Sequence, residues 1–256
     1  MIANLWAKVA ACACLAILSA ACISVSAVES HTQIKANPPM NSGFINKTLY
    51  EGKNARRYVV YVPREYDATK AWPLIVFLHG AGERGNDGLA QTDVGIGRAI
   101  RMHSDRFPCV VLMPQCPEGV WWDKSTNDID ASLEATLDDY NIDHARIYLT
   151  GLSMGGFCTW QYGAVHAGRF AALMPVCGGG NPLDAPQLAK VPIWAFHGAK
   201  DSVVPVQKSR EMVEAVRNAG GKIDYTEFTD LDHNSWDATY NDPKAIEWLL
   251  KQRKGN

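Results

Sequence analysis

The distribution of apolar and polar residues predicts a sheet whose central strands are buried on both faces. Short, mainly apolar runs of this kind are typical of parallel strands covered by helices on either side, and they occur at 73–79, 109–113, 146–150, 170–176 and 192–197. A last strand is predicted at 222–228. By contrast, residues 43–50 and 57–62 alternate polar and apolar side chains, as antiparallel edge strands do.

Segments between these runs carry apolar residues at helical spacing or have helix-terminating residues at their ends. They lie at 91–103, 128–140, from Phe157 onward, 205–219 and 243–251. Strands and helices thus alternate from residue 73 to the end, which predicts an α/β fold with a mainly parallel central sheet and helices on both faces. No long insertion separates the strands at 170–176 and 192–197. We therefore expect an open cleft without a large cap domain.

The first 27 residues predict a signal peptide and hence a secreted or periplasmic protein. Lys8 is followed by an apolar run at 9–18, and small residues at 25–27 suit a cleavage site. The run is short for a membrane span. Ala-Ala-Cys at 20–22 resembles the end of a lipobox, although Ser19 stands where an aliphatic residue is usual, so a lipid anchor at Cys22 is the alternative.

Residues 28–42 are polar, contain Pro38 and Pro39, and predict a flexible lead-in to one domain at 43–256. The hydrophobic content of 47% is ample for the core of one large domain, and the net charge of -2 gives no nucleic-acid footprint. Four cysteines follow the leader. They are Cys109, Cys116, Cys158 and Cys177, and their spacing resembles no zinc site. Cys109, Cys158 and Cys177 suit small apolar positions in strands or helices, and one disulfide bridge among the four is the alternative.

Gly-Leu-Ser-Met-Gly at 151–155 is the main candidate for catalytic chemistry. The predicted strand at 146–150 precedes it and a predicted helix follows, which is the context of a nucleophile elbow. Glycines two residues before and after Ser153 would let neighbouring chains pass without a clashing Cβ. The turn would place the Ser153 hydroxyl at a helix N-terminus, where free N–H groups favour a developing oxyanion.

A serine nucleophile needs a histidine base and an orienting carboxylate. Functional groups gather at the carboxyl ends of strands in an open α/β sheet, and this rule selects Asp201 and His233. The order Ser153, Asp201, His233 is that of α/β-hydrolases. Asp201 could instead cap the helix near Pro205, and His233 could be an ordinary loop histidine. Asp230 and Asp232 are rival acids, although they lie close to His233 in sequence.

The oxyanion needs two backbone N–H donors. Met154, directly after the nucleophile, should supply one, and Ala81, in the glycine-rich loop after His79, should supply the other. His79 ends a strand well before Ser153, and His197 precedes the acid in the chain, so neither fits the role of base. The sequence contains no His-Glu-x-x-His helix, phosphate loop or dinucleotide fingerprint, and we expect no metal and no cofactor.

These motifs resemble the α/β-hydrolase superfamily from about residue 57 to the C-terminus. More narrowly, the chain is similar to secreted carboxylesterases related to feruloyl esterases, polyhydroxybutyrate depolymerases and dienelactone hydrolases. The segments that carry the resemblance are 78–85, 114–117, 151–156 and 232–236. Similar proteins are often described as peptidases of the prolyl oligopeptidase type, but this chain lacks the β-propeller of the large members.

We therefore expect a serine carboxylic-ester hydrolase that works through an acyl-enzyme on short-acyl or aromatic esters, which are free or polymer-linked. Trp121 and Trp122 follow a strand's carboxyl end and are candidates for a substrate-facing wall, or else fill the core. Two alternatives stay open. One is a small serine peptidase, and the other is a non-catalytic carbohydrate-binding protein on a hydrolase scaffold.

Overall fold

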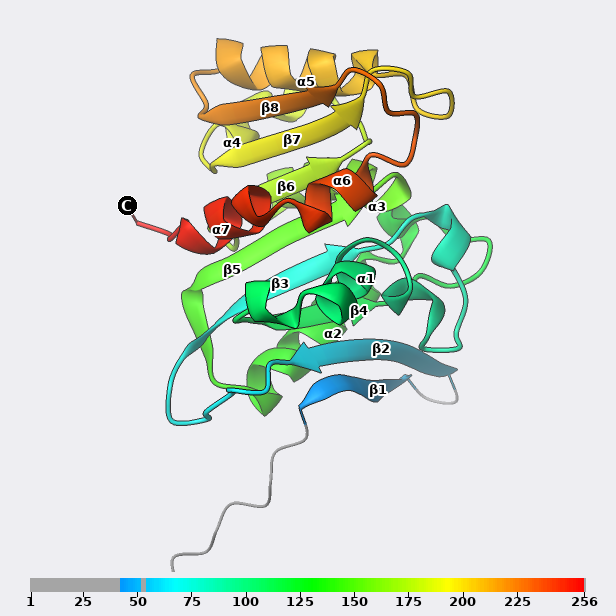
Figure 1. Cartoon of the computed structure of the whole chain (residues 1–256), viewed down its shortest axis with the longest axis vertical. Helices are drawn as coiled ribbons and strands as arrows, with labels where there is room; N and C mark the ends of the chain where they lie inside the picture. Colours follow the sequence, from blue (N-terminus) through cyan, green and yellow to red (C-terminus); the bar gives the residue numbers. More distant parts are fainter. Residues whose placement is uncertain (1–41, 52–53, 256) are drawn as a thin grey trace, which may run out of the picture. The chain divides into compact units, whose positions relative to one another are not determined.

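The computed structural model describes residues 42–51 and 54–255, drawn in colour in Figure 1. The predicted signal peptide, Cys22 and all but the last residue of the predicted lead-in lie outside these ranges. Within them, no helix combines the length and apolar character needed to cross a bilayer.

One eight-stranded sheet forms the centre of the fold, in the order β1-β2-β4-β3-β5-β6-β7-β8 (Figure 1). The first two strands pair antiparallel with each other, and β2 also pairs antiparallel with β4, while all later neighbours are parallel. This confirms the predicted fold class. The strands are β1 (Gly43–Glu51), β2 (Asn54–Val62), β3 (Trp72–Leu78), β4 (Val110–Pro114), β5 (Ile142–Leu152), β6 (Ala172–Val176), β7 (Ile193–Gly198) and β8 (Ile223–Phe228).

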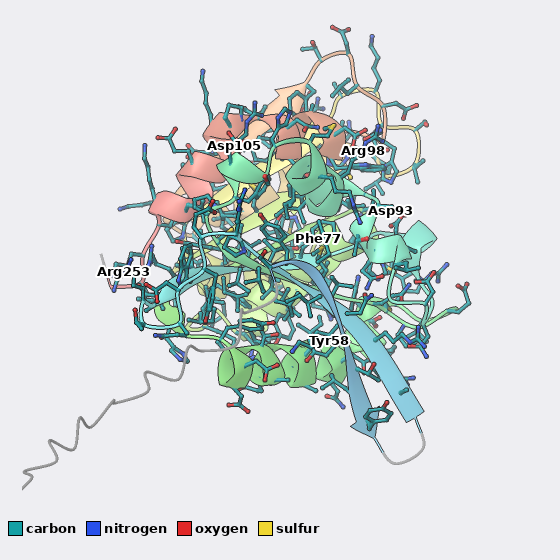
Figure 2. All side chains as sticks on the ribbon, turned by 60° about the horizontal axis from the view of Figure 1, so that its bottom comes forward. Tyr58, Phe77, Asp93, Arg98, Asp105 and Arg253 are labelled. Atoms are coloured by element: carbon teal, nitrogen blue, oxygen red, sulfur yellow. The ribbon has the colours of Figure 1, made fainter. Side chains whose placement is uncertain are left out.

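Helices cover both faces of the sheet, and the side chains of β3 show why its sequence is apolar throughout. Leu74 and Val76 belong to one core cluster, with side chains of α2, α3, α4 and α5. Ile75 and Phe77 belong to the other, with α1, α6 and α7. Phe77 is labelled inside the molecule in Figure 2. The helices are α1 (Gly95–Met102), α2 (Thr126–Asp139), α3 (Met154–Val165), α4 (Ala185–Leu188), α5 (Gln207–Asn218), α6 (Trp236–Asn241) and α7 (Pro243–Lys251).

Two local differences from the sequence prediction have clear causes. The helix expected at 91–103 begins only at Gly95, because Val94 is extended and Gly95 has a φ of 54°. A separate 3-10 turn, Ala90–Thr92, precedes it. A second difference is α6, which the sequence did not suggest, directly after the loop that carries His233. Between β6 and β7 the chain forms only a 3-10 turn (Pro182–Asp184) and the one-turn helix α4.

Candidate active site

Ser153 lies on a sharp turn between β5 and α3, with a φ of 51° and a ψ of -115°. Positive φ is unfavourable for a residue with a side chain and marks a strained, functional turn. The flanking glycines are required by close approach. A Cβ on Gly155 would lie 1.9 Å from the Leu78 carbonyl oxygen, and one on Gly151 would lie 2.5 Å from the Gly155 oxygen. The sequence motif therefore has the local geometry of a nucleophile elbow.

Ser153, His233 and Asp201 meet at the carboxyl edge of the sheet, although they are far apart in the chain. The Nε2 atom of His233 lies 2.9 Å from Ser153 Oγ, and its Nδ1 lies 2.8 Å from Asp201 Oδ2. The side chain of His233 is 18% exposed and that of Asp201 is fully buried. This places a base against the hydroxyl and an acid against the base.

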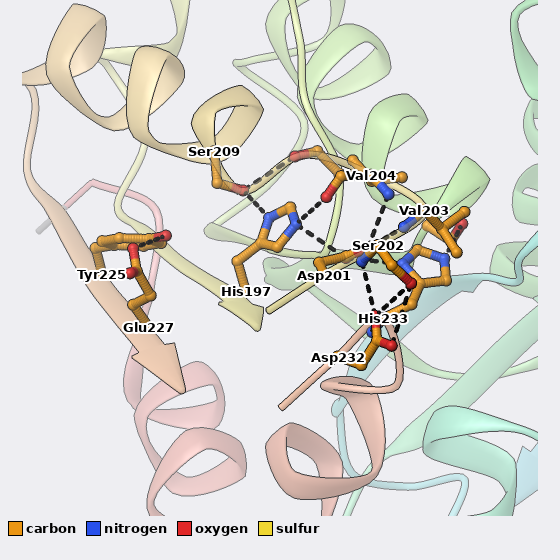
Figure 3. Close-up of polar contacts among 12 residues, drawn as sticks. His197, Asp201, Ser202, Val203, Val204, Ser209, Tyr225, Glu227, Asp232 and His233 are labelled. Atoms are coloured by element: carbon orange, nitrogen blue, oxygen red, sulfur yellow. Dashed lines mark hydrogen bonds and ion pairs between the residues drawn. The ribbon is translucent and has the colours of Figure 1, made fainter. Parts of the chain in front are cut away.

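Asp201 contacts the imidazole of His233 and does not cap the following helix, because the N-cap of α5 is Val206. Its Oδ1 accepts hydrogen bonds from the backbone N–H groups of Val203 and Val204, at 2.9 and 2.8 Å, and so shapes its own loop. Its Oδ2 faces His233 and, 3.1 Å away, Nε2 of His197. Figure 3 shows these contacts together. His197 was excluded as a base by chain order, yet it touches the acid.

Neither rival carboxylate bonds to the imidazole of His233. Asp230 lies at the surface and pairs with Lys200 at 2.9 Å. Asp232 accepts from the N–H and hydroxyl of Ser202 and from the backbone N–H of His233 (Figure 3). These hydrogen bonds lower the pKa of Asp232, because they stabilise its charged form. Asp232 therefore links the two loops after β7 and β8, which hold the acid and the base.

The two expected oxyanion donors begin two helical segments. Ala81 is the first residue of the 3-10 turn Ala81–Glu83, and Met154 is the first residue of α3. N–H groups in such positions have no partner within their own helix. The Ala81 loop lies against the nucleophile, because a Cβ on Gly80 would be 3.7 Å from Ser153 Cβ. Arg84 Nε donates to the Ala81 carbonyl at 2.8 Å and holds the turn.

His79 is a site residue whose importance the sequence analysis missed. Its Nε2 accepts from the Cys116 N–H at 2.9 Å, so the ring proton is on Nδ1, which donates to the Gly80 carbonyl at 2.6 Å. Trp122 Nε1 donates to the His79 carbonyl at 3.0 Å. Burial lowers the pKa of His79 to about 4. A neutral histidine thus ties the oxyanion loop to the loop that follows β4.

A cavity of about 570 Å³ opens beside Met154. One wall is a face of α3, with Met154, Phe157 and Gln161, and the other is the loop 119–124. The two candidate tryptophans differ here. Both line the cavity, but Trp121 is 52% exposed, whereas Trp122 is 1% exposed and donates a hydrogen bond to the His79 carbonyl. Of these two adjacent residues, Trp121 is therefore available to a substrate at the cavity wall, and Trp122 is a buried residue that supports the oxyanion loop.

All four cysteines in the described part of the chain are buried and free, so the disulfide alternative is not realised among them. Cys177 lies nearest the chemistry, since its Sγ and ligand atoms of Asp201 and His233 are within 4.8 Å of one another. Burial raises the pKa of the Cys177 thiol to about 12. A metal would need the thiolate, and it would occupy the acid and base of the triad.

Comparisons with known proteins agree with this geometry. The family model of the dienelactone hydrolase family matches residues 110–245, which is more than half of the chain. A probable feruloyl esterase C of Aspergillus terreus is 25% identical over 206 residues, covering 76% of this chain and 71% of the relative. A bifunctional acetylxylan esterase/xylanase of Neocallimastix patriciarum is 29% identical over 180 residues, covering 68% of this chain but only 26% of that protein.

A solved structure described as a thermostable esterase superposes with a TM-score of 0.75 and 36% identity. The match covers 82% of this chain, which spans 63% of the length of that esterase. The superposition, the sheet order and the serine turn all agree with the family model. The chain therefore belongs to the dienelactone hydrolase family and has the α/β-hydrolase fold.

Proposed function

We propose that this protein hydrolyses esters of aromatic or short acyl groups, carried on polysaccharides or similar polymers, through an acyl-enzyme on Ser153. The chain is a carboxylic ester hydrolase of its family, and the proposal concerns its nucleophile and its substrate. One observation carries it. The Ser153 hydroxyl is hydrogen-bonded to the His233–Asp201 pair, and the next residue, Met154, lines a cavity with an exposed tryptophan.

The hydrogen bonds assign a role to each side chain. Ser153 Oγ attacks the ester carbonyl carbon while its proton passes to His233 Nε2. Asp201 Oδ2 accepts a hydrogen bond from the Nδ1–H of His233 and stabilises the imidazolium. The N–H groups of Ala81 and Met154 receive the oxyanion. The alcohol leaves with the proton from His233, and a water that His233 deprotonates then attacks the acyl-enzyme and releases the acid.

The cavity supports an aromatic acyl group as the preferred substrate part. Its lining includes the aromatic residues Trp121 and Phe157 and the amide-bearing Gln161. Ring stacking suits a flat phenolic acid, and an amide can bond a ring hydroxyl. The relative named as a feruloyl esterase supports an aromatic acyl group, and the one named as an acetylxylan esterase/xylanase supports a short acyl group on a polysaccharide.

A substrate panel tests the proposal. We expect kcat/KM to be highest for methyl ferulate, lower for p-nitrophenyl acetate, and without measurable turnover for a peptide amide. Preference for the peptide amide would identify a serine peptidase. Absence of all turnover in folded protein, together with no labelling by a fluorophosphonate, would identify a non-catalytic binding protein.

We also propose export through the predicted signal peptide, since a polymer substrate lies outside the cell. Mass spectrometry of the exported protein should find a mature chain that begins at Val28. A chain beginning at a lipid-modified Cys22 would replace this proposal with a lipid anchor, and an uncleaved chain would contradict both.

A further inference from the structure

A fully buried histidine lies behind the acid of the triad. His197 is near the end of β7, and its side chain is 0% exposed. Its Nε2 lies 3.0 Å from the Val204 carbonyl oxygen and 3.1 Å from Asp201 Oδ2. On the other side of the ring, Nδ1 lies 2.7 Å from the hydroxyl of Ser209 on α5 (Figure 3).

The surroundings of the ring fix its proton. Both neighbours of Nε2 are acceptors, so Nε2 carries the hydrogen, which it donates to the Val204 carbonyl with Asp201 Oδ2 3.1 Å away. Burial lowers the pKa of His197 and keeps the ring neutral. Nδ1 then accepts a hydrogen bond from the Ser209 hydroxyl. In this orientation the hydroxyl does not donate to the Gly178 carbonyl oxygen, which lies 3.0 Å away.

With this donor, the carboxylate of Asp201 has a complete set of partners. Val203 and Val204 donate to Oδ1 and His233 donates to Oδ2, while the Nε2 atom of His197 lies 3.1 Å from Oδ2. A buried carboxylate whose oxygen lacks a hydrogen-bond donor destabilises the fold and is less firmly held in one orientation. The ring of His197 therefore closes the last side of the acid and holds Oδ2 in line with His233 Nδ1.

We propose that His197 is a positioning residue of the triad, which orients Asp201 through its Nε2–H and transmits the packing of α5 to the acid through Ser209. The inference rests on the proposed function, because it presupposes that Asp201 orients the catalytic base.

The neutrality of the ring matters for this role. A neutral donor fixes Asp201 without cancelling the charge that stabilises the His233 imidazolium, whereas a cation in the same place would compete with His233. The charged and titratable groups that face His197 are Asp201, His233 and, from β8, Glu227. Glu227 is itself paired with Arg210 of α5 at 2.9 Å.

The test compares His197→Phe, which has no donor, with His197→Gln, whose amide is a neutral donor. We expect kcat for p-nitrophenyl acetate to fall by about 10- to 100-fold in His197→Phe with KM nearly unchanged, the effect of losing one hydrogen bond to a charged group. The acid limb of the pH profile should move to higher pH, because Asp201 then shares its charge with His233 alone. His197→Gln should recover most of kcat and the wild-type profile.

Two controls separate positioning from folding. His166→Phe changes a histidine whose ring contacts that of Tyr162 in a tilted arrangement at the far end of α3, and it should leave kcat unchanged. His197→Met replaces His197→Phe if the latter does not fold. In an Asp201→Asn background, His197→Phe or His197→Met should cause no further loss, because the effect passes through Asp201.

A folded His197→Phe or His197→Met enzyme with wild-type kcat and pH profile would overturn the inference. So would an equal additional loss in the Asp201→Asn background. Failure of the proposed function is a separate result, since Ser153→Ala would then retain turnover whatever stands at position 197.

Discussion

The two sides of the candidate active site are built differently. On the catalytic side, Asp201 and His197 are fully buried, and both oxygens of Asp201 are bonded. On the cavity side, Trp121 is 52% exposed, and Lys124 and Gln161 are exposed as well. A buried, fully bonded network tolerates little change, whereas an exposed wall can vary without disturbing the fold. We therefore expect substitutions in the catalytic network to reduce activity strongly, and substitutions in the cavity wall to change substrate preference while the fold is retained.

The largest effect should come from the acid. Asp201→Asn would present an amide donor to His233 Nδ1, which forces the proton onto Nε2 and prevents it from accepting the Ser153 proton. We expect kcat to fall by on the order of 10⁴-fold with the fold retained. The matched control is Asp230→Asn, an exposed acid paired with Lys200, which should keep wild-type kcat. A loss of kcat in Asp230→Asn with wild-type kcat in Asp201→Asn would show that the orienting acid is Asp230.

The buried histidine of the oxyanion loop should make stability depend on pH. The pKa of His79 is about 4 in the fold, against an ordinary histidine value of about 6.5. Between these pH values the unfolded chain binds more protons at His79 than the folded chain does. The contribution of the neutral ring to the free energy of unfolding is therefore complete above about pH 6.5 and is lost as the pH falls toward about 4. Between pH 6.5 and 5 the loss should be about 2 kcal/mol of unfolding free energy.

Urea denaturation at the two pH values measures this loss, and His79→Gln should reduce it. His144→Gln, which changes an exposed histidine, should leave the pH dependence as it is in the wild type. Equal pH dependence in wild type and His79→Gln would show that the ring of His79 is not held neutral by burial.

A smaller effect is expected on the cavity side. Trp121→Ala should raise KM for methyl ferulate by about threefold to tenfold, the range of one aromatic contact, and should leave KM for p-nitrophenyl acetate nearly unchanged. Tyr50→Ala is the matched control, because Tyr50 is a 79% exposed aromatic residue of β1. Equal KM changes for both esters in Trp121→Ala would show that the Trp121 ring does not recognise the aromatic acyl group.

No effect is expected from reducing agents. The four cysteines of the described residues are free and buried, and burial raises the pKa of Cys116 to about 11 and that of Cys177 to about 12. The melting temperature should therefore be the same with and without dithiothreitol. A clear drop on reduction would indicate a disulfide that stabilises the protein.

The catalytic side could be predicted from sequence because its residues obey positional rules. Strand ends locate Asp201 and His233, and the glycines around Ser153 reflect backbone contacts that exclude a Cβ. The role of His197 was missed because the sequence analysis considered this residue only as a catalytic base, a role that its position before Asp201 in the chain excluded. Its role depends on a ring turned toward the acid across a buried loop, and the spacing of His197 and Asp201 at a strand end was the available signal.

The cavity side could not be predicted to the same depth. Trp121 and Trp122 are identical in type and adjacent in sequence, yet one is exposed and the other is buried against His79. Only the packing of two distant loops decides which ring turns inward. The same holds for Gln161, which enters the cavity wall because α3 presents one of its faces to loop 119–124.

The most direct test of the account is active-site labelling by a fluorophosphonate, followed by mass spectrometry of the digested protein. We predict one adduct per chain, located on Ser153, and its loss in Ser153→Ala and strong reduction in Asp201→Asn. An adduct on another residue, or labelling of Ser153→Ala at the wild-type rate, would contradict the assignment of Ser153 as the nucleophile.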